Sequence, residues 1–347
     1  MEASTRLPGD ARAGLAEANS LAEVGRCLEA IELLSDVNRR RRDAEIEARL
    51  VQLRNAAFQE LDRPPTDSPW PDDVPREREE RLPASEIGEL TPELMRDQIL
   101  RYGCVYVPGL VPSAQAEQLA EGIDHAFEGH DRRFAEQPDE PDPDTAPWYV
   151  PFVPSDGEEL ADTRKWIRAG GGVLTPESPR VMFEFLNALE NVGLAPLIAG
   201  YLGERPAMTL IKSALKRLPV IPGADWHQDV AVLGDGIRTI NLWLSLSHCG
   251  DDAPGLDLVP RRLDHVVEQG TGDAGFEWSV GAETVEREAD GVPVLRPIFE
   301  PGDALLFDEL FLHRTATEQG MSKDRYAIET WFFAASRFPD GHIPFVW

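Results

Sequence analysis

The chain has 347 residues, a formal net charge of −28 and a hydrophobic content of 42%, which together indicate a globular protein of one large domain or two ordinary ones. A surface this acidic repels phosphate backbones and anionic membranes, so nucleic-acid binding and membrane attachment are not expected. No apolar run long enough to span a bilayer and no signal-like N-terminus occur, so we expect a cytoplasmic protein.

Residues 1–62 are predicted to form a helical extension. Apolar residues recur at helical spacing over 21–31 and again over 46–61, which indicates two amphipathic helices. Such helices pack on the main domain or on a second subunit, so homo-oligomerisation through them stays open. The stretch 63–87 is rich in proline and acidic residues and is interpreted as a linker.

The main domain is expected to span residues 88–347 and to open with a helix. Thr91 is a good N-cap and Pro92 suits the first helical position, so this helix should run to about residue 102. A short strand over 103–111 and a second helix over 113–127 are predicted to follow.

The middle of the chain carries the predicted substrate lid, residues 137–177. Residues 137–157 are rich in proline and acid with embedded aromatics, which favours a long irregular loop. Within the lid, 164–177 adds arginines and a glycine run. Both parts are expected to contact substrate, and a further helical stretch is predicted over 178–202.

From residue 207 onward the pattern is typical of β structure. The segments 239–246, 303–310 and 325–333 mix alternation with apolar runs, and glycine- and proline-rich turns separate them. Many short strands with turn signals predict a sandwich or barrel.

The sequence ADWHQD places a histidine and a carboxylate two residues apart. In an extended strand, His227 and Asp229 project to one side while Gln228 points away. Alone, such a pair is more often a polar turn. His313, at the end of a later apolar strand, supplies a third ligand, and two histidines with one carboxylate leave adjacent positions open on Fe(II).

The remaining candidates are weaker. Arg325 begins an apolar strand, where its charge needs an anionic partner, either a bound carboxylate or one of the many acidic residues of this chain. His248 directly follows a strand and ranks below His313. The other four histidines are interpreted as surface or structural residues: His125, His130, His265 and His342.

Several segments, in this order, resemble the phytanoyl-CoA dioxygenase family of Fe(II)- and 2-oxoglutarate-dependent oxygenases. Together they cover roughly residues 88–340: LTPELMRDQILRYGCVYVPGLVPSAQAEQLAEGID (90–124), WHQD (226–229), NLWLSL (241–246), PGDALLFDELFLH (301–313) and SKDRYAIETWFF (322–333). The chain departs from the family at VPRRLDH (259–265), where members often show Pro-Gly-Ser-His. Residues 1–62 have no counterpart in the family pattern.

This resemblance implies a mainly β fold with flanking helices, built on a double-stranded β-helix (a cupin-like jelly roll). It implies iron ligands at His227, Asp229 and His313, with Arg325 holding the distal carboxylate of 2-oxoglutarate. Trp243 and Lys216 are the further co-substrate contacts that it suggests, although either residue is equally explained by a structural or exposed position.

The implied activity is that of a dioxygenase, which uses Fe(II), 2-oxoglutarate and O2 and releases succinate and carbon dioxide. Because Asp229 retains the position that related halogenases leave open for halide, hydroxylation of a small or medium-sized organic metabolite is favoured. The same iron centre also serves desaturation, epimerisation or cyclisation. A jelly-roll binding protein without turnover is the alternative from another class.

Overall fold

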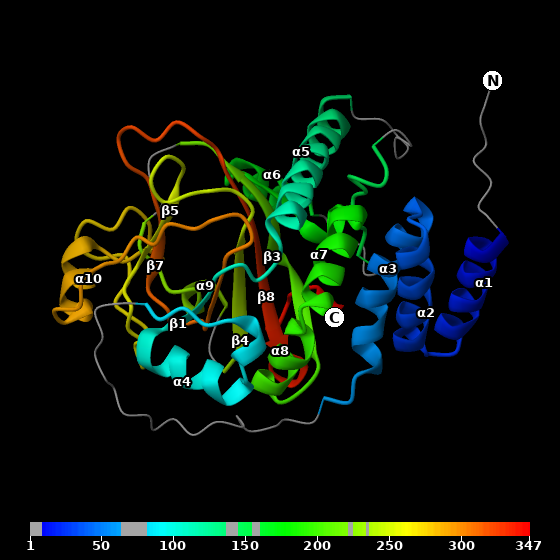
Figure 1. The fold of residues 1–347 in the computed structure, drawn as a ribbon, viewed down its shortest axis with the longest axis horizontal. Helices are drawn as coiled ribbons and strands as arrows, with labels where there is room; N and C mark the ends of the chain where they lie inside the picture. The colour runs from blue at the N-terminus through cyan, green and yellow to red at the C-terminus, as the bar shows by residue number, and fades with distance from the viewer. Residues whose placement is uncertain (1–8, 64–81, 137–144, 155–159, 221–224, 234–235) are drawn as a thin grey trace.

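Two antiparallel sheets form the centre of the protein in a computed structural model that describes residues 9–63, 82–136, 145–154, 160–220, 225–233 and 236–347. The larger sheet has the strand order β1-β6-β4-β8-β3-β2, with β9 also paired to β3, and the smaller sheet pairs β5 with β7 (Figure 1). The strands are β1 (Cys104–Val107), β2 (Gly172–Leu174), β3 (Pro206–Leu218), β4 (Thr239–Ser245), β5 (Gly255–Leu258), β6 (Ala304–Phe307), β7 (His313–Ala316), β8 (Arg325–Ala334) and β9 (Pro344–Val346).

Successive segments of the chain alternate between the two sheets, except that β5 and the segment at Leu295 both belong to the smaller sheet. Isolated bridges extend the smaller sheet on both sides, from His227 to His313 and from Leu258 to Leu295. The order along the chain is therefore β3, the His227 segment, β4, β5, the Leu295 segment, β6, β7 and β8, with β3, β4, β6 and β8 in the larger sheet. This alternation is that of a jelly roll, so the predicted double-stranded β-helix with flanking helices is confirmed.

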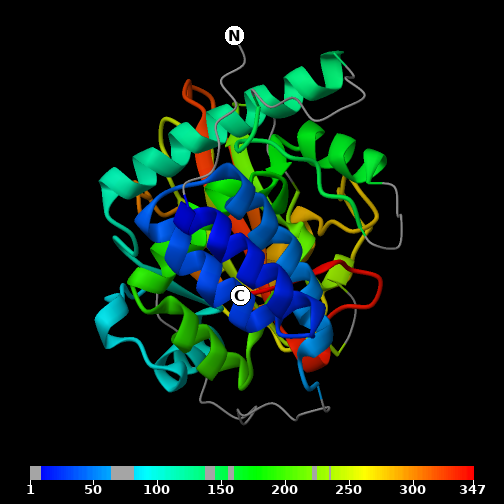
Figure 2. The same cartoon turned by 90° about the vertical axis from the view of Figure 1, so that its right-hand side faces the viewer.

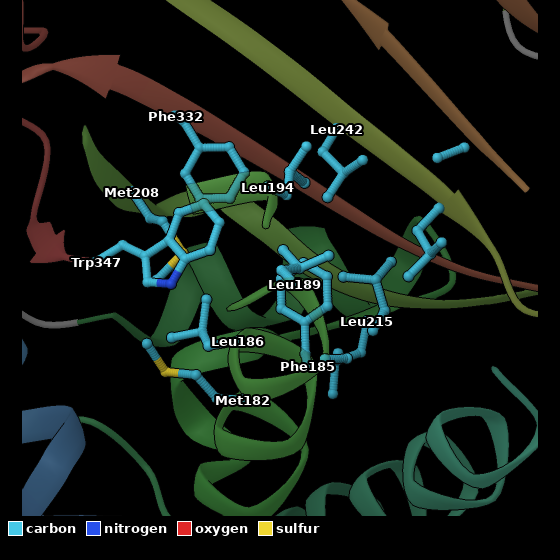
Figure 3. Close-up of a cluster of buried hydrophobic side chains, with 14 of the residues drawn as sticks. Met182, Phe185, Leu186, Leu189, Leu194, Met208, Leu215, Leu242, Phe332 and Trp347 are labelled. Carbon is cyan, nitrogen blue, oxygen red and sulfur yellow. The ribbon is translucent and has the colours of Figure 1, made fainter. Parts of the chain in front are cut away.

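Each strand of the larger sheet has two different faces. On β8, Ile328 and Phe332 belong to the cluster under the helices, whereas Ala327 and Trp331 belong to a second cluster between the sheets. Figure 3 shows Phe332 beside Trp347, and their ring centroids are 4.8 Å apart. Because side chains alternate along a strand, every second side chain points into the space between the two sheets, where a functional site can form.

Helices cover the outer face of the larger sheet and one end of the protein (Figure 1). The helices are α1 (Gly9–Glu23), α2 (Cys27–Arg40), α3 (Ala44–Ala57), α4 (Pro92–Tyr102), α5 (Ser113–Glu136), α6 (Ala161–Ala169), α7 (Pro179–Asn191), α8 (Leu194–Leu202), α9 (Val230–Leu233) and α10 (Ala282–Ala289). Short 3-10 turns add η1 (Phe58–Glu60), η2 (Ile87–Glu89), η3 (Thr175–Glu177) and η4 (Ala335–Arg337).

The N-terminal region forms three helices where the sequence predicts two. The helical periodicity over 21–31 continues across Gly25, but this residue has φ +74°, which ends α1 before α2 begins. Figure 2 shows the three helices lying together across one side of the molecule. Arg54 of α3 donates to the carbonyl of Val346 at 2.9 Å, so α3 is bonded to the C-terminal strand.

A buried ion pair joins this bundle to the rest of the chain. Nε of Arg180, on α7, lies 2.7 Å from both carboxylate oxygens of Glu47, on α3, and the side chain of Glu47 is 0% exposed. Asn38 donates a further hydrogen bond to the same carboxylate at 3.2 Å. Of the predicted linker, residues 64–81 lie outside the described residues, while Ser85 is buried and Ala84 bridges to Tyr106.

The start of the main domain follows the sequence closely. The Oγ1 of Thr91 accepts from the amide of Leu94 at 3.2 Å, and Pro92 is the first helical residue of α4. Gly103 ends the helix with φ 80°, a conformation that favours glycine. The strand and helix predicted next are β1 and α5, and α5 extends to Glu136.

The predicted lid is more ordered than a loop where it is described. Residues 145–154 carry a turn and then irregular chain, whereas 164–177 forms α6, β2 and η3. The segments 137–144 and 155–159 lie outside the described residues. The helical stretch predicted over 178–202 is two helices, α7 and α8, bent by 82°. No single described helix is long and apolar enough to cross a membrane, and this bent pair meets that criterion only when taken together.

Candidate metal centre

Two segments of the smaller sheet bring the three predicted ligands together. The amide of His227 donates to the carbonyl of His313 at 3.0 Å, and the amide of His313 donates back at 3.2 Å. This narrow pair sets the two imidazole rings side by side, with centroids 4.5 Å apart. Asp229 follows at the turn into α9, and one ligand atom from each of the three residues lies within 4.8 Å of the others.

The free atoms of the three side chains suit a metal ion. Nδ1 of His227 lies 3.0 Å from the carbonyl of Asp225, and Nδ1 of His313 lies 3.0 Å from the carbonyl of Phe311. A carbonyl only accepts, so each Nδ1 carries the proton and each Nε2 keeps a lone pair. Oδ2 of Asp229 is buried without a hydrogen-bond partner among the described residues and lies 3.7 Å from Nε2 of His313.

The charges of the site favour the ligating protonation states. Burial, followed by the charge of His227, lowers the pKa of His313 to about 4, so its ring is neutral near pH 7. Burial alone raises the pKa of Asp229, but the charge and hydrogen bond of Lys212, together with the neighbouring imidazoles, outweigh it and hold the pKa below its usual value. The triad thus combines an anionic carboxylate with a neutral imidazole, as metal binding requires.

Gln228, between His227 and Asp229 in the sequence, has a structural role. Its Nε2 donates to the carbonyl of Leu310 at 2.7 Å and to that of His265 at 3.2 Å, and its Oε1 accepts from the amide of Val267 at 2.7 Å. The side chain therefore points away from the ligands, as predicted, and ties their segment to two loops.

Arg325 lies inside the same barrel as the triad. The residue is 4% exposed, its Nη1 donates to the carbonyl of Gly255 at 2.9 Å, and its guanidinium lies 5.6 Å from the ring centroid of Trp243. No ion pair within 4.0 Å joins Arg325 to any residue in the described part of the chain, and its Nε has no hydrogen-bond partner there. Burial lowers the pKa of Arg325, although Cys249 and Glu329 oppose this shift.

The two weaker co-substrate candidates lie on the inward face as well. Trp243 is 3% exposed and packs against Phe299 with ring centroids 4.7 Å apart, so it belongs to the apolar cluster between the sheets. Lys216 is half-buried and its Nζ lies 3.5 Å from the carbonyl of Gly170, before β2. Burial lowers the pKa of Lys216.

Three residues near the triad were missed at the level of sequence. Lys212 donates from Nζ to Oδ1 of Asp229 at 3.0 Å. Glu329 is half-buried on β8 and pairs in register with Trp243, and its carboxylate has no hydrogen bond or ion pair among the described residues. The alternation of RYAIETWFF places Glu329 on the face of Arg325, which was the available signal.

The third missed residue is Trp278, in the loop before α10. Its ring meets that of His227 edge-on, with centroids 5.7 Å apart and an angle of 89°. Phe276 stacks on Trp278 at 5.2 Å and 6°. Trp278 is 37% exposed and Phe276 is 58% exposed, so the two rings form an accessible apolar wall beside a candidate ligand.

The other histidines stay outside this site. His248 contacts Asp251 at 2.7 Å and Glu300 at 3.0 Å on the surface, and with Asp251 and Asp252 it forms a second group of potential ligands. The four remaining histidines each contact neighbouring side chains away from the triad: His125, His130, His265 and His342.

Comparison with known proteins gives matches among solved structures alone. No family model and no curated protein matches the chain. EctD from S. alaskensis with 2-oxoglutarate and 5-hydroxyectoine is 15% identical, with 73% of this chain and 80% of that chain covered and a TM-score of 0.49. The epimerase SnoN in complex with Fe3+, alpha ketoglutarate and nogalamycin RO is 14% identical, with 70% and 83% covered and a TM-score of 0.43. The resemblance to the phytanoyl-CoA dioxygenase family stays a prediction.

Proposed function

We propose that the protein is a non-haem Fe(II)- and 2-oxoglutarate-dependent dioxygenase of the phytanoyl-CoA dioxygenase type, which hydroxylates a small or medium-sized organic metabolite. One observation supports this proposal: a His-Asp-His triad, of which Asp229 and His313 are buried and His227 is half-buried, shares a barrel with the buried Arg325, which makes no ion pair within 4.0 Å among the described residues. Two imidazoles and one carboxylate on one side of a metal are the donor set typical of Fe(II) oxygenases.

The distance between triad and arginine suits a short dicarboxylate. Arg325 donates to Gly255 at one end of β5, and Leu258 at the other end pairs with His313. Three residues of extended chain span about 10 Å. 2-Oxoglutarate would therefore be held at its distal carboxylate by Arg325, over the ring of Trp243, with its 2-oxo acid end toward the triad.

The residues of the chain would bind the iron, orient the co-substrate and exclude water from the site. His227, Asp229 and His313 would hold the iron through Nε2, Oδ2 and Nε2, the atoms that their other hydrogen bonds leave free. Iron and 2-oxoglutarate, when bound, supply oxidation by O2 coupled to release of succinate and carbon dioxide. The apolar cluster around Trp331 and Phe307 lies between the sheets and would limit access of bulk water to the iron.

The organic substrate is proposed to approach past the accessible aromatic wall of Trp278 and Phe276, which adjoins His227. An apolar wall beside a polar centre is typical of small-molecule sites. The metal ligands alone do not distinguish hydroxylation from desaturation, epimerisation or cyclisation, so product analysis has to follow substrate identification.

The test is turnover of the co-substrate. Purified protein with Fe(II), ascorbate and air should convert 2-oxoglutarate to succinate slowly without substrate and faster with one, and His313→Ala should abolish both rates. An active iron site would show this conversion even before the substrate is known. Absence of succinate from folded, iron-loaded wild type across a broad metabolite set would instead favour a binding protein without turnover.

A further inference from the structure

A lysine donates a hydrogen bond to one oxygen of Asp229, the candidate carboxylate ligand. Lys212, on β3, donates from Nζ to Oδ1 of Asp229 at 3.0 Å. The side chain of Asp229 is 3% exposed and that of Lys212 is 17% exposed, so the pair is largely shielded from solvent. A shielded ion pair holds its geometry better than one at the surface, because water competes less for both partners.

The second oxygen of the same carboxylate is left free. Oδ2 of Asp229 is buried, has no hydrogen-bond partner in the described parts of the chain, and lies 3.7 Å from Nε2 of His313. A buried carboxylate oxygen without a partner is costly in free energy. The carboxylate thus presents one oxygen to the ring nitrogens and gives the other to an ammonium group.

We propose that Lys212 is a positioning residue that fixes Asp229 as a one-oxygen ligand of the metal. The inference rests on the proposed iron site and adds a residue that the ligand pattern does not contain. With Oδ1 held by Lys212, only Oδ2 faces the metal. A carboxylate that chelated through both oxygens would take a coordination position that the co-substrate and O2 need.

The position of Lys212 on its strand is specific. Lys216, four residues further along β3, reaches the carbonyl of Gly170 and contacts no ligand of the triad. Both lysines are half-buried on the same strand, so general charge balance in the barrel does not distinguish them. The 3.0 Å bond to Asp229 belongs to Lys212 alone among the described residues.

Two effects of Lys212 on a bound metal oppose each other. Its positive charge repels a divalent cation and offsets the charge of Asp229, which weakens metal binding. Its hydrogen bond orients the carboxylate toward the metal, which strengthens binding. Outer partners of metal ligands are typically worth about 10- to 100-fold in metal affinity. We therefore expect orientation to dominate, and the sign of the change is measurable.

The experiment is a Co(II) titration of metal-free protein without 2-oxoglutarate, followed by the visible absorption of Co(II). Lys212→Met is expected to bind Co(II) roughly 10- to 100-fold more weakly and to change the absorption intensity, which reports coordination number. Lys212→Arg, which keeps a charged donor, should restore most of the affinity. Lys216→Met is the matched control and should bind Co(II) like wild type. Circular dichroism of the metal-free variants establishes that each is folded.

The outcomes separate this inference from the proposed function. If wild type binds Co(II) through the triad, shown by loss in Asp229→Ala, but Lys212→Met binds equally well or more tightly, the positioning role is wrong and the metal site stands. Normal Co(II) binding with weakened 2-oxoglutarate binding in Lys212→Met would also overturn it, because the lysine would then serve the co-substrate. If wild type binds no Co(II) at the triad, the iron site and the role of Lys212 are refuted together.

Discussion

Replacing Arg325 by methionine is expected to remove most of the affinity for 2-oxoglutarate while leaving the fold intact. The guanidinium is 4% exposed and its Nε has no hydrogen-bond partner among the described residues. A carboxylate bound there would meet a desolvated cation with a donor to spare. The substitution removes both the charge and the planar set of donors that matches a carboxylate.

The expected loss follows from the burial of Arg325. Truncating one partner of a buried charge pair costs about 2–5 kcal/mol, which is roughly 30-fold to a few thousand-fold in Kd. Arg325→Lys keeps the charge and should lose less. Without co-substrate, Arg325→Met removes a buried charge that makes no ion pair within 4.0 Å among the described residues, so the free energy of unfolding should be unchanged or raised.

The assay is anaerobic calorimetry of 2-oxoglutarate with Fe(II)-loaded protein, beside urea unfolding of the metal-free form. Arg217→Met is the matched control, because Arg217 lies on the neighbouring strand and contacts Asp124 at 2.9 Å with 40% of its side chain exposed. An Arg325→Met variant that is folded and binds 2-oxoglutarate within a few-fold of wild type would refute the assignment of the distal carboxylate.

Three further outcomes are expected. His227→Ala should abolish Fe(II) binding, measured by metal content after desalting, and retention of a full equivalent would contradict the ligand assignment. Burial lowers the pKa of His313 to about 4, below its unfolded value near 6.5, so metal-free protein should lose stability as the pH falls from about 6.5 to about 4. The dependence of the unfolding free energy on pH, measured by urea unfolding at several pH values, should be weaker in His313→Gln. Glu47→Ala leaves Arg180 without its buried partner and should lower the free energy of unfolding by about 3–5 kcal/mol, and a loss below about 1 kcal/mol would show that the pair is not a main link to α7.

The grouping of the three candidate ligands was predictable because each of them follows local rules. The two-residue spacing of His227 and Asp229 predicts that both side chains project to one side, although Asp229 lies at the turn into α9 and not in a strand. An apolar strand precedes His313. The same kind of rule located α4 through Thr91 and Pro92, since capping depends on adjacent residues.

Contacts between residues that lie far apart in the sequence could not be predicted from such local rules. Lys212 and Lys216 have the same residue type and share β3, and only the folded structure shows that Lys212 alone reaches Asp229. Trp278 contacts His227 from a loop about fifty residues further along the chain, and no sequence periodicity predicts that contact. The break at Gly25 divided an otherwise continuous helical pattern, because a single glycine is compatible with a helix interior as well as with its end.

The most direct test of the iron and 2-oxoglutarate site is spectroscopic. Fe(II) and 2-oxoglutarate are added to metal-free protein under anaerobic conditions, and the weak visible metal-to-ligand charge-transfer band of the chelate is recorded. A saturable band is expected that disappears in Asp229→Ala and needs far more 2-oxoglutarate in Arg325→Met. Folded wild-type protein that binds Fe(II) but gives no band at any 2-oxoglutarate concentration would contradict the proposed co-substrate site.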